Sequence, residues 1–254
     1  MAGSQVIIRD MTALHANFVV ASPPSDTGIL DNPIWNALNT EHGSFANGGG
    51  LAKRYPPEIG PLSGLVEQSA AAYEALYAVT GAGGLAAQFL VEPPIERAGW
   101  TLVREGLMSQ MIWYGEIAPT AMLAGDVELR RLTAADVPAM VELAELTKPG
   151  PFRQRTRELG EFFGIFEEER LLAMAGQRMR LPGFVEVSAV CTHPDARGRG
   201  YARVVMTEAI ADILQRGSTP MLHVFAANDS AIRVYEGLGF VHRRSLHLAV
   251  LEAG

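Results

Sequence analysis

One stretch of the sequence, CTHPDARGRGYARVV at residues 191–205, restricts the fold more than any other. The apolar run FVEVSAVCT, residues 184–192, stops at His193-Pro194, and two glycines follow before an apolar helical pattern begins. That pattern consists of Ala202, Val205, Met206, Ala209 and Ile213. The stretch therefore predicts a strand, a tight turn and a helix in direct succession. Because the strand is apolar on both faces except at Glu186, Ser188 and Thr192, we expect it in the interior of a sheet.

The two glycines, Gly198 and Gly200, fall at the predicted N-terminus of this helix. The first-turn N–H groups of a helix lack carbonyl partners and the helix dipole is positive there, so that end can hold a phosphate. Side chains at the two glycine positions would obstruct its approach. The alternative interpretation is a plain strand-to-helix turn with solvated arginines.

Two well-known phosphate-binding loops do not match this stretch. A Walker loop needs Lys-Ser or Lys-Thr after its last glycine, and Tyr201-Ala202 stands there. A Rossmann fingerprint needs a third glycine and an acidic residue at the end of the next strand. Arg203 occupies the third-glycine position, and the next strand, MLHVFAAN, contains no acidic residue.

Composition sets the broad class of the protein. With 254 residues, 48% of them apolar, the chain can bury the core of one large or two ordinary domains. Its start lacks a basic segment and its apolar runs are too short for a bilayer, so we expect a cytoplasmic protein without membrane contact. The single cysteine, Cys191, excludes an internal disulfide and a cysteine-rich zinc cage, and no metal is expected. A net charge of −7 argues against nucleic-acid binding.

The sequence divides near residue 125. Residues 1–124 hold five basic and eleven acidic residues, whereas residues 125–254 hold sixteen and seventeen. The second domain, 125–254, begins with a strand over 127–132, and Thr133 with Asp136 forms a capping-box pattern that predicts a helix start. The first region, 1–124, is expected to be α/β, with a helix over about 62–80.

The glycine stretch resembles the acyl-CoA loop of the GNAT acyltransferase superfamily, whose pattern is Arg or Gln, two residues, Gly, one residue, then Gly or Ala. Residues 197–202, RGRGYA, match every fixed position. Downstream, NDSAIRVYEGLGF at 228–240 resembles the second signature of the family, an Asn after a strand and a Tyr in the following helix. The resemblance covers about residues 126–254. More loosely, TKPGPF and the glycine stretch look like bacterial members with an extra N-terminal region, which could be a degenerate copy of the same fold.

The resemblance implies a mixed, mostly antiparallel central sheet flanked by helices, an α/β (α+β) fold. It also implies acetyl-CoA as acyl donor. In this family the central strand parts from its neighbour, so that the backbone of Val190, Cys191 and Thr192 would pair with the pantetheine arm. The loop would hold the pyrophosphate through Arg197, Gly198, Arg199, Gly200, Tyr201, Ala202 and Arg203. Asn228 and Ser230 would contact the cofactor, or they cap the next helix and do nothing else.

The resemblance further implies attack of an amine on a thioester, which requires a proton acceptor and a donor for the departing thiolate. Tyr235 matches the position of the donor, although it could equally be a core-packing aromatic. Glu186 stands thirteen residues before Arg199, where family members place a strand carboxylate. We expect it to act as base, directly or through a water relay; the alternative is a buried salt bridge with Arg178 or Arg180.

The sequence thus predicts an N-acetyltransferase that modifies a primary amine of a small molecule or peptide in a ternary complex. An acyl-cysteine route is disfavoured, because alternation places Cys191 on the face of the strand opposite Glu186. The alternative of another class is a non-catalytic acyl-CoA-binding sensor or scaffold. The expected partners are acetyl-CoA and the amine acceptor, and a homodimer is left open.

Overall fold

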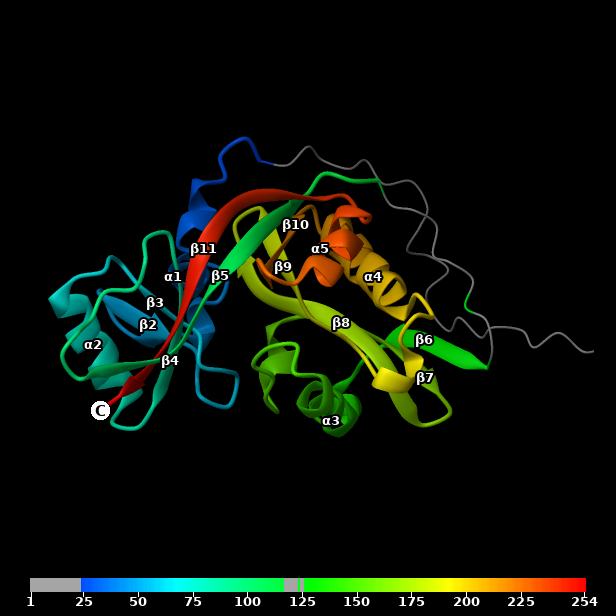
Figure 1. Cartoon of the computed structure of the whole chain (residues 1–254), viewed down its shortest axis with the longest axis horizontal. Coiled ribbons are helices and arrows are strands. Elements are labelled where there is room, and N and C mark those ends of the chain that lie inside the picture. The colour runs from blue at the N-terminus through cyan, green and yellow to red at the C-terminus, as the bar shows by residue number, and fades with distance from the viewer. Residues whose placement is uncertain (1–23, 117–122, 124–125) are drawn as a thin grey trace, which may run out of the picture.

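The computed structural model describes residues 24–116, 123 and 126–254 of the chain (Figure 1). The helices are α1 Pro33–Asn39, α2 Ala70–Thr80, α3 Val137–Thr147, α4 Tyr201–Gln215 and α5 Asp229–Glu236. The first five strands are β1 Asn47–Gly48, β2 Ala52–Arg54, β3 Ser63–Leu65, β4 Leu85–Leu90 and β5 Trp100–Trp113. The others are β6 Val127–Arg131, β7 Phe162–Glu167, β8 Arg170–Leu181, β9 Phe184–Thr192, β10 Thr219–Phe225 and β11 Phe240–Ala253.

An eight-stranded sheet organises these elements in the order β4-β11-β5-β10-β9-β8-β7-β6. Its neighbouring strands are antiparallel except for β9 and β10, which are parallel. A small second sheet, β1-β2-β3, lies beside α2. The predicted mixed, mostly antiparallel sheet flanked by helices is therefore confirmed, and β9 takes the interior place that its apolar sequence indicated.

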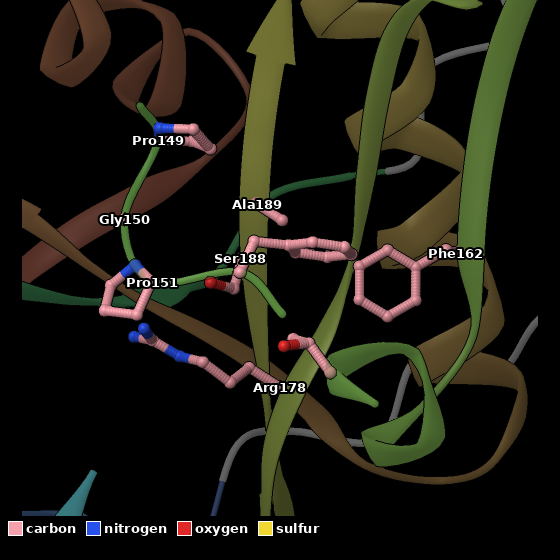
Figure 2. A pocket seen from close by; sticks show the side chains of 9 residues that line it. Pro149, Gly150, Pro151, Phe162, Arg178, Ser188 and Ala189 are labelled. Atoms are coloured by element: carbon pink, nitrogen blue, oxygen red, sulfur yellow. The ribbon is translucent and has the colours of Figure 1, made fainter. Parts of the chain in front are cut away.

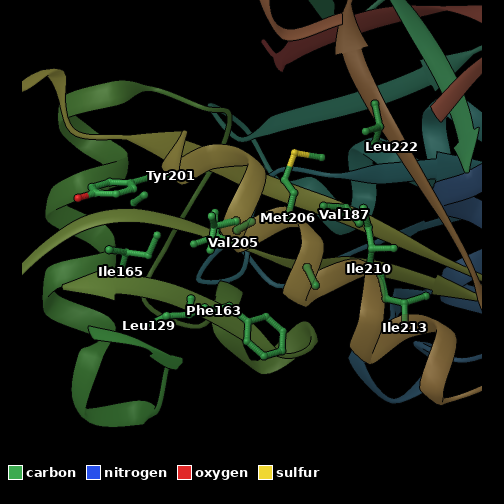
Figure 3. Close-up of a cluster of buried hydrophobic side chains, with 14 of the residues drawn as sticks. Leu129, Phe163, Ile165, Val187, Tyr201, Val205, Met206, Ile210, Ile213 and Leu222 are labelled. Atoms are coloured by element: carbon green, nitrogen blue, oxygen red, sulfur yellow. The ribbon is translucent and has the colours of Figure 1, made fainter. Parts of the chain in front are cut away.

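Helices cover both faces of the sheet, with α4 on one side of β8 and α3 on the other (Figure 1). On the α4 face, Val205, Met206 and Ile210 pack against strand residues such as Phe163 and Val187 (Figure 3). On the other face, α3 packs near the β7 end of the sheet and α1 packs on the strands nearer its middle. Successive side chains of β9 therefore enter opposite cores: Val185 and Val187 face α4, and Phe184 faces α1. This pattern is typical of a strand buried on both faces.

The sheet extends across the division near residue 125. Strand β5 lies between β11 and β10, and β4 pairs with the outer edge of β11. Strands β4 and β5, which precede residue 125, thus belong to the same sheet as β6 to β11. The assignment of 1–124 and 125–254 as separate domains, and of the first as a degenerate copy, stays a prediction.

The helix predicted over 62–80 is shorter in the structure. It begins at Ala70, where the Ser69 side chain accepts a hydrogen bond from the N–H of Ala72. The segment before it forms β3 instead, and Gly64 lies so close to the backbone of Trp35 that a Cβ there would clash. Pairing with β2 and this close approach override a helical pattern that continues only from residue 72 onward.

The helix start predicted from Thr133 and Asp136 is confirmed. The Thr133 side chain accepts from the N–H of Ala135 at 3.3 Å, and Asp136 accepts from the N–H of Thr133 at 2.7 Å. A short 3-10 turn, Ala134–Asp136, precedes α3 as a result. None of the helices within the described ranges is long and apolar enough to cross a membrane.

Candidate active site

The parallel strands β9 and β10 part shortly after they meet. Their register runs from Thr219 opposite Phe184 to Met221 opposite Glu186 and stops there. Beyond this point β9 pairs with β8, and β10 pairs with β5. The backbone groups of 190–192 on the β10 side therefore have no ladder partner, which gives an extended ligand an edge along which to bind.

A bulge in β9 lies at the same place. Ala189 has φ +53°, a left-handed conformation that is rare for a residue with a side chain, and the register with β8 shifts between Gly176 and Met174. The extra residue changes which way the following side chains point. Cys191 consequently packs with Met140 and Leu143 of α3, on the same face as Glu186. The prediction that Cys191 faces away from Glu186 was wrong, because strict alternation does not pass through a bulge.

The new position of Cys191 does not make it a nucleophile. Burial raises the pKa of its thiol to about 11, although hydrogen bonds with Thr147 and Met174 oppose the shift. A thiol with such a pKa holds little thiolate at neutral pH. The acyl-cysteine route therefore remains disfavoured, now on the ground of burial.

The glycine loop leads into α4 with an open space above it. Gly198 and Gly200 both have φ +78°, and a Cβ built on either would meet no atom within 4 Å. Because Val204 is the first residue of α4 to donate back into the helix, at 3.3 Å to the oxygen of Gly200, the preceding amides have no intrahelical acceptor. The loop thus offers free N–H groups and unobstructed room to an anion such as a pyrophosphate.

The side chains of this loop divide into exposed and buried ones. Arg197, Arg199 and Arg203 are exposed; Arg199 lies 3.4 Å from Glu167, and Arg203 donates to the oxygen of Gly237 at 2.9 Å. Tyr201 is buried in the core under α4 and Ala202 is half-buried, so these two can offer a ligand their backbone amides. Their roles in cofactor binding stay predictions.

Asn228 and Ser230 lie at the start of α5. The Asn228 side chain accepts from the N–H of Ala231 at 3.2 Å and from the Ser230 hydroxyl at 3.0 Å. The capping role is therefore present in the structure. A contact with the cofactor stays a prediction for both residues.

Tyr235 lies on α5, half-buried against the core under α4, with its ring edge-on to Phe240. Burial raises the pKa of its hydroxyl to about 12, and the nearby Cys191 adds to the shift. Tyr235 packs against the same core under α4 as Val190 of β9, the strand that parts from β10. The hydroxyl stays protonated at neutral pH and can donate a proton.

Glu186 is fully buried and ion-paired. Its carboxylate accepts from Arg178 Nε at 2.7 Å and Nη2 at 2.5 Å, and from His223 Nδ1 at 2.8 Å. Burial alone raises the pKa of Glu186, but Arg178, with help from His223, more than offsets this and lowers it to about 2. Gln110 donates to the other ring nitrogen of His223 at 2.9 Å. This geometry favours the buried salt bridge that the sequence left open, and the role of base stays a prediction.

We expect Glu186→Ala to lower the free energy of unfolding by about 3–5 kcal/mol, because it leaves the Arg178 charge buried without a partner. Since the folded pKa lies below the ordinary value of 4.5, the contribution of Glu186 is full above that pH and is lost as the pH falls toward 2. Urea titrations at several pH values measure both effects. Glu158→Ala, which breaks the exposed Arg155 pair, should change stability little. A loss for Glu186→Ala as small as that of the control would contradict the assignment.

Two small pockets lie on the face of the sheet that carries α1 and α3. The first is shallow, partly open to solvent, and lined by the loop Pro149–Phe152 together with Phe162, Ser188 and Ala189 (Figure 2). The second, equally small, is lined by Tyr55, Ile59 and Leu62 of the N-terminal region, among others. Pro151, Thr156 and Arg178 line both. The first pocket reaches the β9 bulge at Ala189, so it adjoins the gap between β9 and β10 on the face that carries α3.

No local sequence pattern indicates that Ala189 and Tyr55 line pockets beside the gap. A positive φ at a non-glycine residue has no local signal, and Tyr55 comes near Arg178 only through the long-range fold. From the sequence, Arg178 was predicted only as a possible salt-bridge partner of Glu186. Ser188 was noted only as a polar residue of the apolar strand. Within the described part of the chain, no group of three His, Cys, Asp or Glu side chains is placed to hold a metal ion.

Comparisons with known proteins agree with this geometry. A family model described as FR47-like protein matches residues 162–247. Mycothiol acetyltransferases of Mycobacterium ulcerans and Mycobacterium marinum are 35% identical over 83 residues, or 29% of this chain. The match spans only 26% of the length of these curated relatives.

Solved structures extend the likeness to most of the chain. A GCN5-related N-acetyltransferase of Kribbella flavida, 15% identical, matches 87% of this chain and 96% of its own with a TM-score of 0.59, which shows the fold. A structure from Novosphingobium aromaticivorans assigned to the GNAT family is 36% identical, with a TM-score of 0.80 over 89% of this chain and 98% of that one. The resemblance seen in the sequence is thereby confirmed, and this chain belongs to the GNAT acetyltransferase family.

Proposed function

We propose that the protein is an acetyl-CoA-dependent N-acetyltransferase, which transfers the acetyl group to a primary amine of a small molecule or peptide by direct attack in a ternary complex. The observation that carries the proposal is the open glycine loop at the start of α4, beside the parted ends of β9 and β10. The loop offers room and free amides for a pyrophosphate, and the gap offers an unpaired strand edge for an extended arm.

The residues that would hold acetyl-CoA follow from this placement. The backbone of Val190, Cys191 and Thr192 borders the gap, and the amides of residues 198–203 lie at the start of α4. Asn228 caps α5 and Ser230 lies in its first turn. Acetyl-CoA supplies a thioester whose carbonyl carbon an amine can attack. We propose that the protein works in the cytoplasm, without a metal, a nucleic acid or a membrane as partner; a homodimer stays a prediction.

Two proton transfers remain for the protein. Tyr235, protonated at neutral pH, donates to the departing thiolate from the α5 side of the gap. The amine must lose a proton on the opposite side. Because Glu186 is paired with Arg178 and buried, the structure favours the water relay over direct action of this carboxylate. We infer that water in the pocket beside Ser188 and Ala189 passes this proton outward to bulk solvent, where buffer bases accept it.

The test is release of free CoA thiol from acetyl-CoA in the presence of amines, amino acids and short peptides. We expect release that depends on the acceptor and yields the acetylated amine by mass spectrometry. If the protein binds acetyl-CoA but no acceptor stimulates release, the non-catalytic sensor or scaffold replaces the enzyme as the better interpretation. If it does not bind acetyl-CoA at all, both interpretations fail.

A further inference from the structure

Arg178 brings a positive charge to the two pockets beside the β9 bulge. It is the sole charged residue among those lining the two pockets, and it belongs to both. Its partner Glu186 lines neither pocket, and its side chain is only 1% exposed. A molecule in either pocket therefore meets the guanidinium and not the carboxylate.

The guanidinium keeps one of its two binding edges available. Arg178 uses Nε and one N–H of Nη2 for Glu186, which leaves the second N–H of Nη2 and both of Nη1. Those remaining groups form the end-on edge, which can hold a second carboxylate through two parallel hydrogen bonds. Figure 2 shows this end of Arg178 directed toward Pro151, a residue of the pocket wall.

A second arginine, Arg180, lies two residues after Arg178 on β8. Arg180 donates to Gln177 at 2.7 Å and forms no ion pair with another described residue; its buried Nε has no hydrogen-bond partner. Burial, reinforced by Arg180, lowers the pKa of His42 to about 4, so His42 is neutral. Arg180 lines neither pocket, so Arg178 is the charged group that a carboxylate in the first pocket would meet.

We propose that the acceptor is an amine that also carries a carboxylate, as in an amino acid or a short peptide, and that Arg178 binds this carboxylate through its end-on edge. The inference rests on the proposed acetyl transfer and names its substrate class. Arg178 occupies one part of the first pocket, and Ser188 with the Ala189 bulge occupies another. In this arrangement the carboxylate binds at Arg178, and the amine points toward the Ala189 bulge, where β9 and β10 part. Pro149, Pro151, Phe152 and Phe162 supply apolar walls for a side chain.

The experiment compares matched acceptors that differ in the carboxylate alone. Each of the protein amino acids, and a set of dipeptides, is assayed beside its C-terminal amide by CoA thiol release. We expect kcat/KM for the best acid to exceed that of its amide by about 10- to 100-fold, the range for hydrogen bonds to a charged group. This comparison uses the wild-type protein and needs no variant.

A variant then locates the effect. Arg178→Lys keeps a positive charge beside Glu186 but loses the planar fork, so it should lower kcat/KM for the acid by about tenfold or more and change that for the amide little. Binding of acetyl-CoA by calorimetry shows that the variant is folded and should be unchanged. Arg155→Lys, on the exposed turn before residues 156–159, is the matched control and should keep the preference.

The possible results separate the two proposals. Equal turnover of acids and amides, or an acid preference that survives Arg178→Lys, overturns the inference and leaves the acetyltransferase intact. Absence of acceptor-dependent release for every compound overturns the proposed function, and the inference falls with it.

Discussion

Gly200→Glu is expected to raise the dissociation constant for acetyl-CoA at least about 100-fold and to abolish transfer. The residue lies at the start of α4 with φ +78°, and nothing occupies the space into which its side chain would extend. A glutamate there fills the space proposed for the pyrophosphate and adds a negative charge close to it, within a few ångströms, where repulsion is strong. Isothermal titration calorimetry with acetyl-CoA and with CoA measures the loss.

The same helix offers a control for this variant. Gly217, just beyond the C-terminus of α4, has φ +74° and equally open space around its Cβ position. Gly217→Glu therefore imposes the same left-handed strain, about 1–2 kcal/mol, without touching the loop. It should match Gly200→Glu in thermal stability and keep wild-type affinity. Similar affinity in both variants would refute the role of the loop.

The loop and its setting could be predicted from the sequence because their determinants are local. Gly198 and Gly200 adopt a backbone conformation that only glycine takes readily, and the apolar pattern on either side specifies a buried strand and an amphipathic helix. The capping box likewise depends on two residues, Thr133 and Asp136, that stand three positions apart. Such features follow from spacing, and the structure reproduces them.

The features that the sequence did not reveal depend on distant parts of the chain. The segment before Ala70 is a strand because β2 and Trp35 lie against it. Cys191 changes face because Ala189 adopts a positive φ, for which its residue type gives no signal. Tyr55 lines a pocket with Arg178 through the packing of the N-terminal region on the sheet. The glycine loop and its helix were therefore predictable, whereas the β9 bulge and the pockets beside it were not.

The state of Glu186 shows how pairing decides the chemistry of a buried carboxylate. A carboxyl in an apolar strand has a raised pKa if it is alone, which would suit a base. The bidentate contact from Arg178 reverses the direction and holds the carboxylate ionised, with a pKa of about 2. The same contact leaves the other edge of the guanidinium free, so one ion pair disfavours direct proton abstraction by Glu186 and provides the proposed carboxylate receptor.

Tyr235→Phe should leave acetyl-CoA affinity within about twofold of wild type and reduce kcat by about 10² to 10⁴, the range for loss of a general acid. The ring keeps its packing against Phe240, since only the hydroxyl is removed. That hydroxyl has a pKa of about 12, so in the wild-type protein it stays neutral and able to donate across the pH range of an ordinary assay.

Leaving-group dependence distinguishes proton donation from packing. If Tyr235 protonates the thiolate, Tyr235→Phe should slow transfer from acetyl-CoA far more than transfer from an analogue whose thiol has a lower pKa, because a better leaving group needs less help. A packing role would slow both donors equally and lower thermal stability. Phe240→Leu, which alters the same aromatic contact without touching the hydroxyl, provides that comparison. Unchanged kcat in Tyr235→Phe would remove the residue from the mechanism and leave protonation of the thiolate to solvent in the gap between β9 and β10.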